Sequence, residues 1–542
     1  MGKHAAIASD HPAASQAGLE ALKAGGNAVD AACATALALG VTVPHSSGIG
    51  GGGFAVVYLA KEKKVVTLDF REKAPGAIKA EMYFRDGKPD PKLSRKGGLA
   101  IAVPGEVKGL TELVKRWGKL PFSACVKPAE RLARAGIPLT DDAADVINGD
   151  GKRDAQMTAF LGQVFALNRP FALPVKPGEV VKRPALAGTL AKLRTGGADA
   201  FYKGPIADEI VKATVAAGGV ISRDDLRAYD VVERAPVKTS YRGLEVYSMA
   251  PPSSGGIVLI EALGILGDKM KEPPKGPGRF NSAYLHTLAE ALKHGFADRA
   301  RHLGDPDFVQ VPLAKLSDPA YHHELAARID DQHTLKPERY GMPTAPAVPP
   351  KDGGTTNLSI IDADGNAVAL TTTVNLFYGS QVVAGPTGII LNDQMDDFAI
   401  APDSPNAFKL IGNDRNAIAP GKRPLSSMSP TIVLEDGKAK LAVGGAGGPT
   451  IISGTLQVLL NVVDGKLDAQ EASSAPRIHH QWSPDVLALE PDFPRDVVEN
   501  LEKRGHKTNV RGHITTVNVV VQTPKGVEAA SEFRRGGAPA GY

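Results

Sequence analysis

The chain has 542 residues, of which 43% are hydrophobic and 23% are charged, a composition typical of a globular protein. Its formal net charge of +4 is too small for this length to indicate a nucleic-acid-binding surface. The longest apolar runs, 31–43 and 451–463, are short and broken by polar residues or glycine, so no transmembrane segment is predicted. Cys33 and Cys125 lie beside Ala-rich helical runs and are expected to be small buried residues.

The N-terminal region predicts two helices followed by a glycine run. Pro12 to Ala24 is helical in pattern and ends at Gly25-Gly26, and Asn27 is expected to cap a second helix to about Leu39. Residues 48–53 then match the dinucleotide-binding pattern G-x-G-x-x-G. That motif must open a helix, whereas 54–59 and 65–69 alternate like two strands. We therefore expect a close-packed backbone crossing, with nucleotide binding as a rival interpretation.

Residues 98–330 alternate helical segments with short strands, without a separate domain. The stretch 333–354 is polar and rich in proline, which is typical of a linker. A β-hairpin pattern follows at once, with strands at 358–362 and 367–375 around a turn at 364–366. The linker therefore runs directly into a strand that begins with Thr355.

This arrangement has a chemical use. If the chain is cut between Gly354 and Thr355, Thr355 carries a hydroxyl nucleophile and a free α-amine that can act as its base. Such an amine titrates near pH 7.7–8.0, so a large neutral fraction is available. Gly354 lacks a Cβ and leaves room for the hydroxyl to reach its carbonyl.

Several motifs together resemble the γ-glutamyltranspeptidase family. They are GGGGF and DFRE in the N-terminal part, then GGTTNLSIIDADGNAVALTTTVN, LNDQMDDF and GKRPLSSMSPTIV, and the similarity extends over almost the whole chain. The resemblance implies an autoprocessed N-terminal-nucleophile hydrolase with an α/β fold, a four-layer αββα sandwich. Residues 1–354 would form the large subunit and 355–542 the small catalytic subunit, as one intertwined unit.

The resemblance also implies the roles of the site residues. Thr355 would be the nucleophile, Thr373 its hydrogen-bond partner, and the backbone of Gly447-Gly448 the oxyanion hole. The substrate's α-carboxylate and α-amino group would be bound by Arg71, Asn375, Gln394, Asp397, Ser426 and Ser427. A guanidinium fork suits a carboxylate better than lysine does. Residues 403–413 match a lid loop, in which Phe408 stands where several relatives have tyrosine.

Three features qualify this interpretation. The acidic run Asn392 to Asp397 could indicate a metal site, but it lacks the EF-hand spacing, so no metal is expected. Asn357 replaces a histidine common in the family, and Glu532-Phe533 interrupts a stretch that usually reads Asp-Pro. Neither departure affects a residue with a predicted catalytic role.

The implied reaction cleaves γ-glutamyl amides such as glutathione or glutamine through a γ-glutamyl-Thr355 ester. Water or an amino-acid or peptide acceptor then takes the acyl group, and no cofactor is implied. One alternative is a cephalosporin or glutaryl acylase of the same family, whose substrate has no α-amino group for Asp397. Another is a non-catalytic processed binding protein, against which the intact Thr355, Thr373 and Gly447-Gly448 argue.

The expected location follows from the same resemblance, since family members are usually exported. The chain begins Met1-Gly2-Lys3-His4 without a signal peptide. We expect a periplasmic or secreted protein whose leader has been removed, with a cytoplasmic location left open.

Overall fold

The computed structural model describes residues 2–151, 153–276, 280–341, 354–401 and 404–542. The first two helices begin where their capping residues predict. Helix α1 (Pro12–Lys23) begins with a proline, and α2 (Ala28–Thr42) begins with a capping box between Asn27 and Asp30. Helix α2 is buried along its whole length and runs three residues past the predicted end, because packing outweighs the low helix propensity of Gly40. Most of the predicted linker, 342–353, lies outside the described residues.

The first of two central sheets has seven antiparallel strands and contains the predicted hairpins. Side chains alternate along each strand, so that Phe54, Val56 and Tyr58 face the second sheet while Ala55 and Val57 face helices. In sheet order the strands are β22 (Ala540–Gly541), β1 (Ala6–Ser9), β11 (Gly354–Ile361), β12 (Ala367–Asn375), β2 (Gly52–Leu59), β3 (Lys64–Phe70) and β8 (Val232–Arg234).

The second sheet has six antiparallel strands. In sheet order they are β21 (Gly526–Ala530), β20 (Thr516–Thr523), β16 (Lys438–Ala446), β15 (Thr431–Glu435), β10 (Leu244–Ser248) and β9 (Val237–Tyr241). A buried apolar cluster between the two sheets includes Ala369, Ile432 and Val520. Short strand pairs lie outside the sheets: β4 (Phe84–Arg85) with β5 (Lys88–Pro89), β6 (Ile137–Pro138) with β7 (Val180–Val181), β13 (Val382–Val383) with β14 (Ile390–Leu391), and β17 (Ile478–His479) with β18 (Leu487–Leu489) and β19 (Thr508–Val510).

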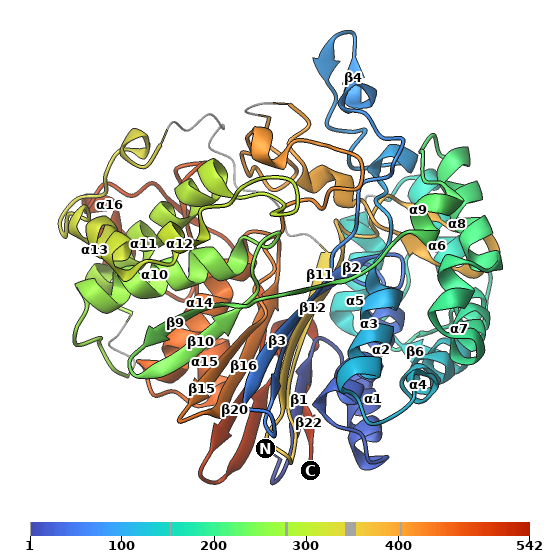
Figure 1. The fold of residues 1–542 in the computed structure, drawn as a ribbon, viewed down its shortest axis with the longest axis horizontal. Helices are drawn as coiled ribbons and strands as arrows, with labels where there is room; N and C mark the ends of the chain where they lie inside the picture. The colour runs from blue at the N-terminus through green and yellow to red at the C-terminus, as the bar shows by residue number, and fades with distance from the viewer. Residues whose placement is uncertain (1, 152, 277–279, 342–353, 402–403) are drawn as a thin grey trace.

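Helices cover the outer face of each sheet, which gives the predicted αββα sandwich (Figure 1). On the first sheet, α1 and α2 are joined by α3 (Glu106–Trp117), α4 (Phe122–Ala135), α7 (Pro184–Tyr202) and α8 (Pro205–Ala216). Near them lie α5 (Asp141–Asn148), α6 (Ala155–Val164) and α9 (Arg223–Arg227) (Figure 1). The second sheet has α10 (Gly255–Lys269), α11 (Ser282–His302), α12 (Leu313–Leu316), α13 (Pro319–Ala327), α14 (Thr450–Val463), α15 (Ala469–Ser474) and α16 (Arg495–Lys503) on its side.

Both sheets mix strands from the two sides of the Gly354–Thr355 bond. In the first sheet β11 pairs with β1 on one side and with β12 on the other. In the second, β10 from the N-terminal part pairs with β15 from the C-terminal part. Neither part therefore contains a complete sheet, and the two chain ends lie together because β1 also pairs with β22 (Figure 1).

The glycine run enters strand β2 rather than a helix, as the crossing interpretation predicts. A Cβ on Gly51 would lie 2.0 Å from the Thr373 carbonyl oxygen, and one on Gly53 would lie 2.1 Å from that of Thr371. The glycines thus let β2 approach β12 closely, and the dinucleotide interpretation is not supported.

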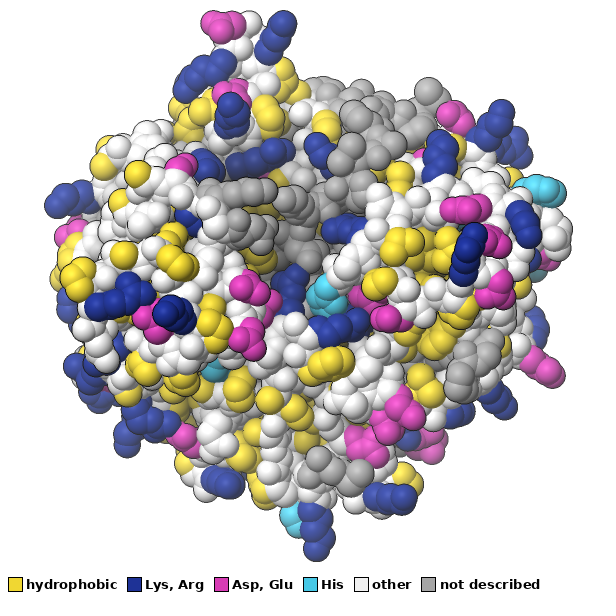
Figure 2. All heavy atoms as spheres, turned by 180° about the vertical axis from the view of Figure 1, so that it is seen from behind, with side chains coloured by type: hydrophobic (Ala, Val, Ile, Leu, Met, Phe, Trp, Pro, Cys, Tyr) yellow, Lys and Arg dark blue, Asp and Glu magenta, His cyan; other side chains and the backbone are white. Residues whose placement is uncertain are grey.

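Two observations bear on the membrane-spanning and nucleic-acid-binding functions that the sequence does not indicate. None of the helices in the described residues has the length and apolar character needed to cross a membrane. On the face shown in Figure 2, basic and acidic side chains are interspersed and do not form a continuous basic surface.

Candidate active site

The predicted nucleophile lies at the start of the central strand β11. Thr355 is paired in register with Thr373 of β12, and their hydroxyl oxygens are 3.0 Å apart. The strand runs from Gly354 to Ile361 and so begins before the predicted hairpin strand 358–362, and its pairing shifts between Gly354 and Thr355. Both threonines are buried, with 8% and 2% exposed area.

The hydrogen bonds of Thr373 define which hydroxyl donates to which. Thr373 Oγ1 donates its only proton to the carbonyl oxygen of Gly354, at 2.6 Å. It accepts from the backbone N–H of Asn375, at 2.8 Å. Thr355 must therefore donate in the contact between the two hydroxyls. The result is a directed chain from the Thr355 hydroxyl through Thr373 to the Gly354 carbonyl.

Gly447 and Gly448 form the tight turn between β16 and α14. Their φ angles are +132° and +63°, values at which a side chain is strained. Within the described residues no acceptor is found for either N–H group. Gly448 borders the cavity, where the ring of Phe408 would lie 2.6 Å from a Cβ on this residue. The turn therefore brings Gly448 to the same cavity as the threonine pair.

Arg71 and Asp397 both line the cavity and form an ion pair, in which Arg71 is buried and Asp397 is partly buried. Arg71 Nη2 lies 2.5 Å from Asp397 Oδ2, and Gln394 Nε2 donates to the same oxygen at 3.2 Å. Burial raises the pKa of Asp397 above its ordinary value, and the nearby Arg71 cation opposes the rise. Behind Arg71, burial also raises the pKa of Glu72 to about 7. The carboxylate of Asp397 thus depends on a cationic partner.

The remaining predicted residues complete the wall of the cavity. Asn375 adopts φ +80° and donates from Nδ2 to the Asp393 carbonyl oxygen. Ser426 is held by backbone hydrogen bonds to Pro252 and Ser254. The cavity measures only about 20 Å³, roughly the space of one water molecule. Its lining contains Arg71, Thr355, Thr373, Asn375, Gln394, Asp397, Phe408, Ser426, Ser427 and Gly448.

The acidic run near the cavity has protein partners for its three aspartates. Asp393 Oδ1 accepts from the backbone N–H of Leu376, Asp396 pairs with Arg95 at 3.0 Å, and Asp397 pairs with Arg71. The carboxylates are directed at different groups, which does not suit a shared metal ion.

Several residues that the sequence motifs did not identify form hydrogen bonds that support the predicted site residues. Arg299 of α11 donates from Nε to Ser254 Oγ at 3.1 Å. Ser254 Oγ in turn donates to the carbonyl oxygen of Ser426 at 2.6 Å. Asn406 of the lid loop donates from Nδ2 to Asp397 Oδ1 at 3.3 Å. No local periodicity marks these contacts, because each joins segments distant in the chain or on separate turns.

The two departures from the family pattern have local explanations. Asn357 uses its amide to bind Leu370 and Thr371 of the neighbouring strand. Glu532 is buried and pairs with Arg477 at 3.1 Å and with Arg534 at 2.7 Å. Both residues are thus part of the internal hydrogen bonding that supports the sheets and the C-terminal segment.

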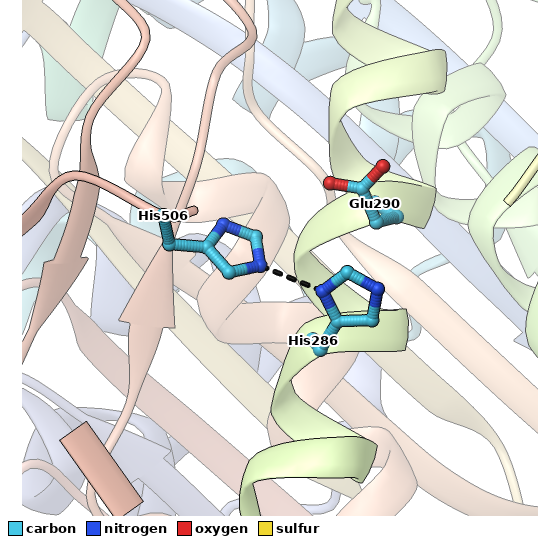
Figure 3. Close-up of side chains that lie close together, drawn as sticks. All are labelled: His286, Glu290 and His506. Carbon is cyan, nitrogen blue, oxygen red and sulfur yellow. Dashed lines mark hydrogen bonds between the residues drawn. The ribbon is translucent and has the colours of Figure 1, made fainter. Parts of the chain in front are cut away.

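A second cluster of ligand-type side chains lies apart from the cavity (Figure 3). His286 Nδ1 and His506 Nε2 are 2.8 Å apart, and His286 Nε2 bonds the Asp330 carbonyl at 2.7 Å. Glu290 is already bound by Lys293 at 3.1 Å, by Thr334 at 2.6 Å and by Tyr340.

A divalent cation at this cluster would have to break these bonds and lie beside the buried Lys293 ammonium. We therefore interpret the cluster as a hydrogen-bonded network that joins α11 to residues 330–340 and to His506.

The fold and the threonine pair define the class of the protein as an N-terminal-nucleophile hydrolase. The γ-glutamyltranspeptidase family model matches residues 14–542. The glutathione hydrolase proenzyme of Escherichia coli (strain K12) is 41% identical over 526 residues, which covers 97% of this chain and 89% of that protein. The chain belongs to the γ-glutamyltranspeptidase family.

Two solved structures extend the comparison. The cephalosporin acylase from Bacillus halodurans has a TM-score of 0.85 at 30% identity, covering 100% of this chain and 96% of that one. The γ-glutamyltranspeptidase of Helicobacter pylori has a TM-score of 0.55 at 37% identity, covering 61% of this chain and 92% of that one. The predicted fold and family are thus confirmed.

The histidine network predicts a loss of stability in mild acid. Burial lowers the pKa of His506 to about 3, against about 6.5 in the unfolded chain. Between these values the unfolded chain binds more protons, so the stability falls as the pH is lowered from 6.5 toward 3. His506→Gln keeps a donor toward His286 without this titration, and the drop in Tm between pH 7 and pH 5 should become smaller.

The matched control is His4→Gln, since His4 is exposed and forms no ion pair within the described residues. It should leave the dependence of Tm on pH unchanged. Parallel curves for the wild type and His506→Gln would show that the histidine pair does not titrate on unfolding.

Proposed function

We propose that the protein is a γ-glutamyltransferase and glutathione hydrolase, which cuts its own chain before Thr355 and then uses Thr355 as its nucleophile. The observation that supports this most directly is the directed hydrogen-bond chain from Thr355 through Thr373 to the Gly354 carbonyl. It lies beside a cavity with one cation and one anion, Arg71 and Asp397.

Self-cleavage would use the hydrogen-bond chain as a proton relay. Thr355 Oγ1 attacks the Gly354 carbonyl carbon, its proton passes to Thr373, and Thr373 gives its own proton to the carbonyl oxygen. Collapse of this adduct breaks the C–N bond and forms an ester, with the α-amine of Thr355 as leaving group. Water then hydrolyses the ester, which leaves a carboxylate on Gly354 and restores the Thr355 hydroxyl.

In the catalytic cycle the freed α-amine would act as the base. It takes the proton of Thr355 Oγ1 as this oxygen attacks the γ-carbonyl carbon, and the Gly447-Gly448 N–H groups stabilise the oxyanion. The amine passes the proton to the leaving amine. The γ-glutamyl ester then reacts with water, or with the amino group of an amino acid or peptide. Each step uses the chain's own groups, water or the acceptor.

Recognition would exchange the Arg71–Asp397 pair for the head group of the substrate. The α-carboxylate of a γ-glutamyl compound offers Arg71 a bidentate acceptor, and its α-ammonium offers Asp397 a cation. Gln394 and Asn375 would assist at the ammonium, and Ser426 and Ser427 at the carboxylate. A cavity of about 20 Å³ must widen for this exchange, and separating the ion pair provides the space.

The subunits, partners and location belong to the same proposal. After cleavage, residues 1–354 and 355–542 would stay associated, because both sheets need strands from each part. Glutathione and glutamine would be donors, and amino acids or peptides acceptors. The protein would work in the periplasm or outside the cell.

The cephalosporin acylase alternative has the high TM-score to the Bacillus halodurans enzyme in its favour. Asp397 favours the γ-glutamyl assignment, because a glutaryl chain without an ammonium would leave this partly buried carboxylate without a cationic partner once Arg71 binds the substrate. A non-catalytic binding protein would not need the relay of two threonines.

The first test of the proposed function concerns self-cleavage. Thr355→Ala should remain one chain without activity. Thr373→Val has nearly the same shape but no hydroxyl, so it should cleave about 10²–10⁴-fold more slowly. The measurement is a time course on a denaturing gel, with N-terminal sequencing of the smaller band to locate Thr355.

The control for Thr373→Val is Thr371→Val, two residues earlier in β12, where the hydroxyl accepts from the Asn357 amide instead. It should cleave at nearly the wild-type rate. Turnover of substrate by a protein that never cleaves would contradict the proposed mechanism.

The second prediction concerns Asp397. Removing one partner of a buried charge pair costs roughly 3–5 kcal/mol, so Asp397→Asn should lose about two to three and a half decades in kcat/KM on γ-glutamyl-p-nitroanilide. Glutaryl-p-nitroanilide lacks the ammonium and should lose far less. Asp464→Asn serves as the control, since the buried Asp464 pairs with Arg242 outside the cavity lining. Equal losses on the two anilides would show that Asp397 is structural.

The third prediction concerns the oxyanion donors. Gly448→Ala strains φ +63° and displaces an N–H group, so kcat should fall by about 10²–10³. Because the new Cβ would also contact Phe408, the same change is measured together with Phe408→Ala. Gly437→Ala, at φ +69° with open space around it, controls for the backbone strain alone. Recovery of kcat in the double variant would assign the loss to the ring contact instead.

A further inference from the structure

The lid loop contains a tight turn that rests on the cavity. Pro405 and Ile411 form a bridge, and between them Asn406 N donates to the Leu410 carbonyl at 3.2 Å. Phe408 and Leu410 point into the apolar cluster of the second sheet and line the cavity. We call residues 405–411 the lid turn.

Asn406 organises this turn through its side-chain oxygen. Asn406 Oδ1 accepts from the backbone N–H groups of Phe408, at 3.0 Å, and Leu410, at 3.1 Å. Two N–H donors at one oxygen determine the orientation of the amide, since a flipped amide would set its NH₂ group against both. The NH₂ group must therefore point the other way, toward Asp397 Oδ1 at 3.3 Å.

Two consecutive carboxylates thus hold the lid turn, and only one of them lines the cavity. Asp396 Oδ2 accepts from the backbone N–H of Ala407 at 2.8 Å, while its Oδ1 is bound by Ser94 and Arg95. Asp397 accepts from Asn406 on one oxygen and from Arg71 and Gln394 on the other. The Asp396 contact is structural, whereas the Asp397 contact involves the carboxylate that the substrate would use.

We propose that Asn406 is a positioning residue that determines specificity for substrates with an α-ammonium, an inference that rests on the proposed function. Its amide orients the Asp397 carboxylate, leaving Oδ2 for the ammonium when Arg71 moves to the α-carboxylate. Oδ1 remains occupied by Asn406, so Asp397 cannot turn away with Arg71.

The same residue connects the head group to the oxyanion glycines. Its Oδ1 fixes the backbone of Phe408, and the Phe408 ring lies against Gly448. An ammonium bound at Asp397 therefore stabilises, through Asn406, the ring that covers the reaction centre. A glutaryl compound, without an ammonium, leaves the turn dependent on the Asp396–Ala407 contact and apolar packing.

The experiment uses Asn406→Ser in the self-cleaved protein. A serine hydroxyl can still accept from the Phe408 N–H, but it is too short to reach Asp397. We expect kcat/KM on γ-glutamyl-p-nitroanilide to fall about tenfold, as for loss of a hydrogen bond to a charged group, mainly through KM. The value on glutaryl-p-nitroanilide should change little. Asn406→Thr offers the same acceptor if the serine variant is not recovered.

Asn413→Ser is the matched control. Asn413 belongs to the same loop and holds the carbonyls of Ala300 and Arg301 and the N–H of Arg415, without contacting Asp397. Any effect of its substitution should be proportionally equal on the two anilides.

A double-mutant cycle provides a second measurement. If Asn406 acts through Asp397, then adding Asn406→Ser to Asp397→Asn should cause little further loss on the γ-glutamyl anilide. Additive losses, or equal losses on both anilides for Asn406→Ser, would overturn the inference. A wild-type enzyme that cleaves itself but uses only the glutaryl anilide would overturn the proposed function and this inference together. Specific sensitivity of the γ-glutamyl anilide, with non-additivity, supports both.

Discussion

The chemistry of this protein depends on how closely strand β12 is enclosed by its neighbours. Gly51 leaves no room for even a methyl group against the Thr373 carbonyl, and on the other side Thr373 is in register with Thr355. The backbone therefore fixes where the Thr373 hydroxyl points, and its one proton goes to the Gly354 carbonyl. Main-chain packing thus directs a hydroxyl donor at the carbonyl of the Gly354–Thr355 peptide bond. This suits the proposed precursor, in which the α-amine base would not exist until the bond is cut.

Buried charges show a second constraint, since each must keep a partner. Lys293 and Glu290 are fully buried and bonded to fixed protein groups, so their pairing is structural. Arg71 and Asp397 are different, because they line a cavity. Separating them requires something that supplies one negative and one positive charge at a short distance. An α-amino acid head group carries such a pair of charges, so on the proposed function it would take the place of the ion pair that closes the pocket.

Much of the fold could be predicted because local sequence patterns indicate where its helices and strands begin and which faces they bury. Capping at Asn27, alternation along 367–375 and the glycines before Phe54 each gave the correct element. The predicted site residues other than Gly447 and Gly354 line one cavity, and the roles that the resemblance implies for them stay predictions. What could not be predicted depends on contacts without a sequence period. The His286–His506 pair joins residues 220 positions apart, and the amide of Asn406 is oriented by two backbone N–H groups that only the folded turn brings together.

The fold itself does not decide whether the enzyme acts on γ-glutamyl or on glutaryl-type acyl groups. A protein named as a cephalosporin acylase shares nearly the whole architecture at a TM-score of 0.85, so the choice must lie in a few side chains. Here three donors, Arg71, Gln394 and Asn406, converge on Asp397, and burial makes its charge costly without them. A site built for a glutaryl chain gains nothing from such an arrangement. Because a carboxylate held this way is satisfied again only by another cation, the proposed function assigns the choice of acyl group to the surroundings of Asp397 rather than to Thr355.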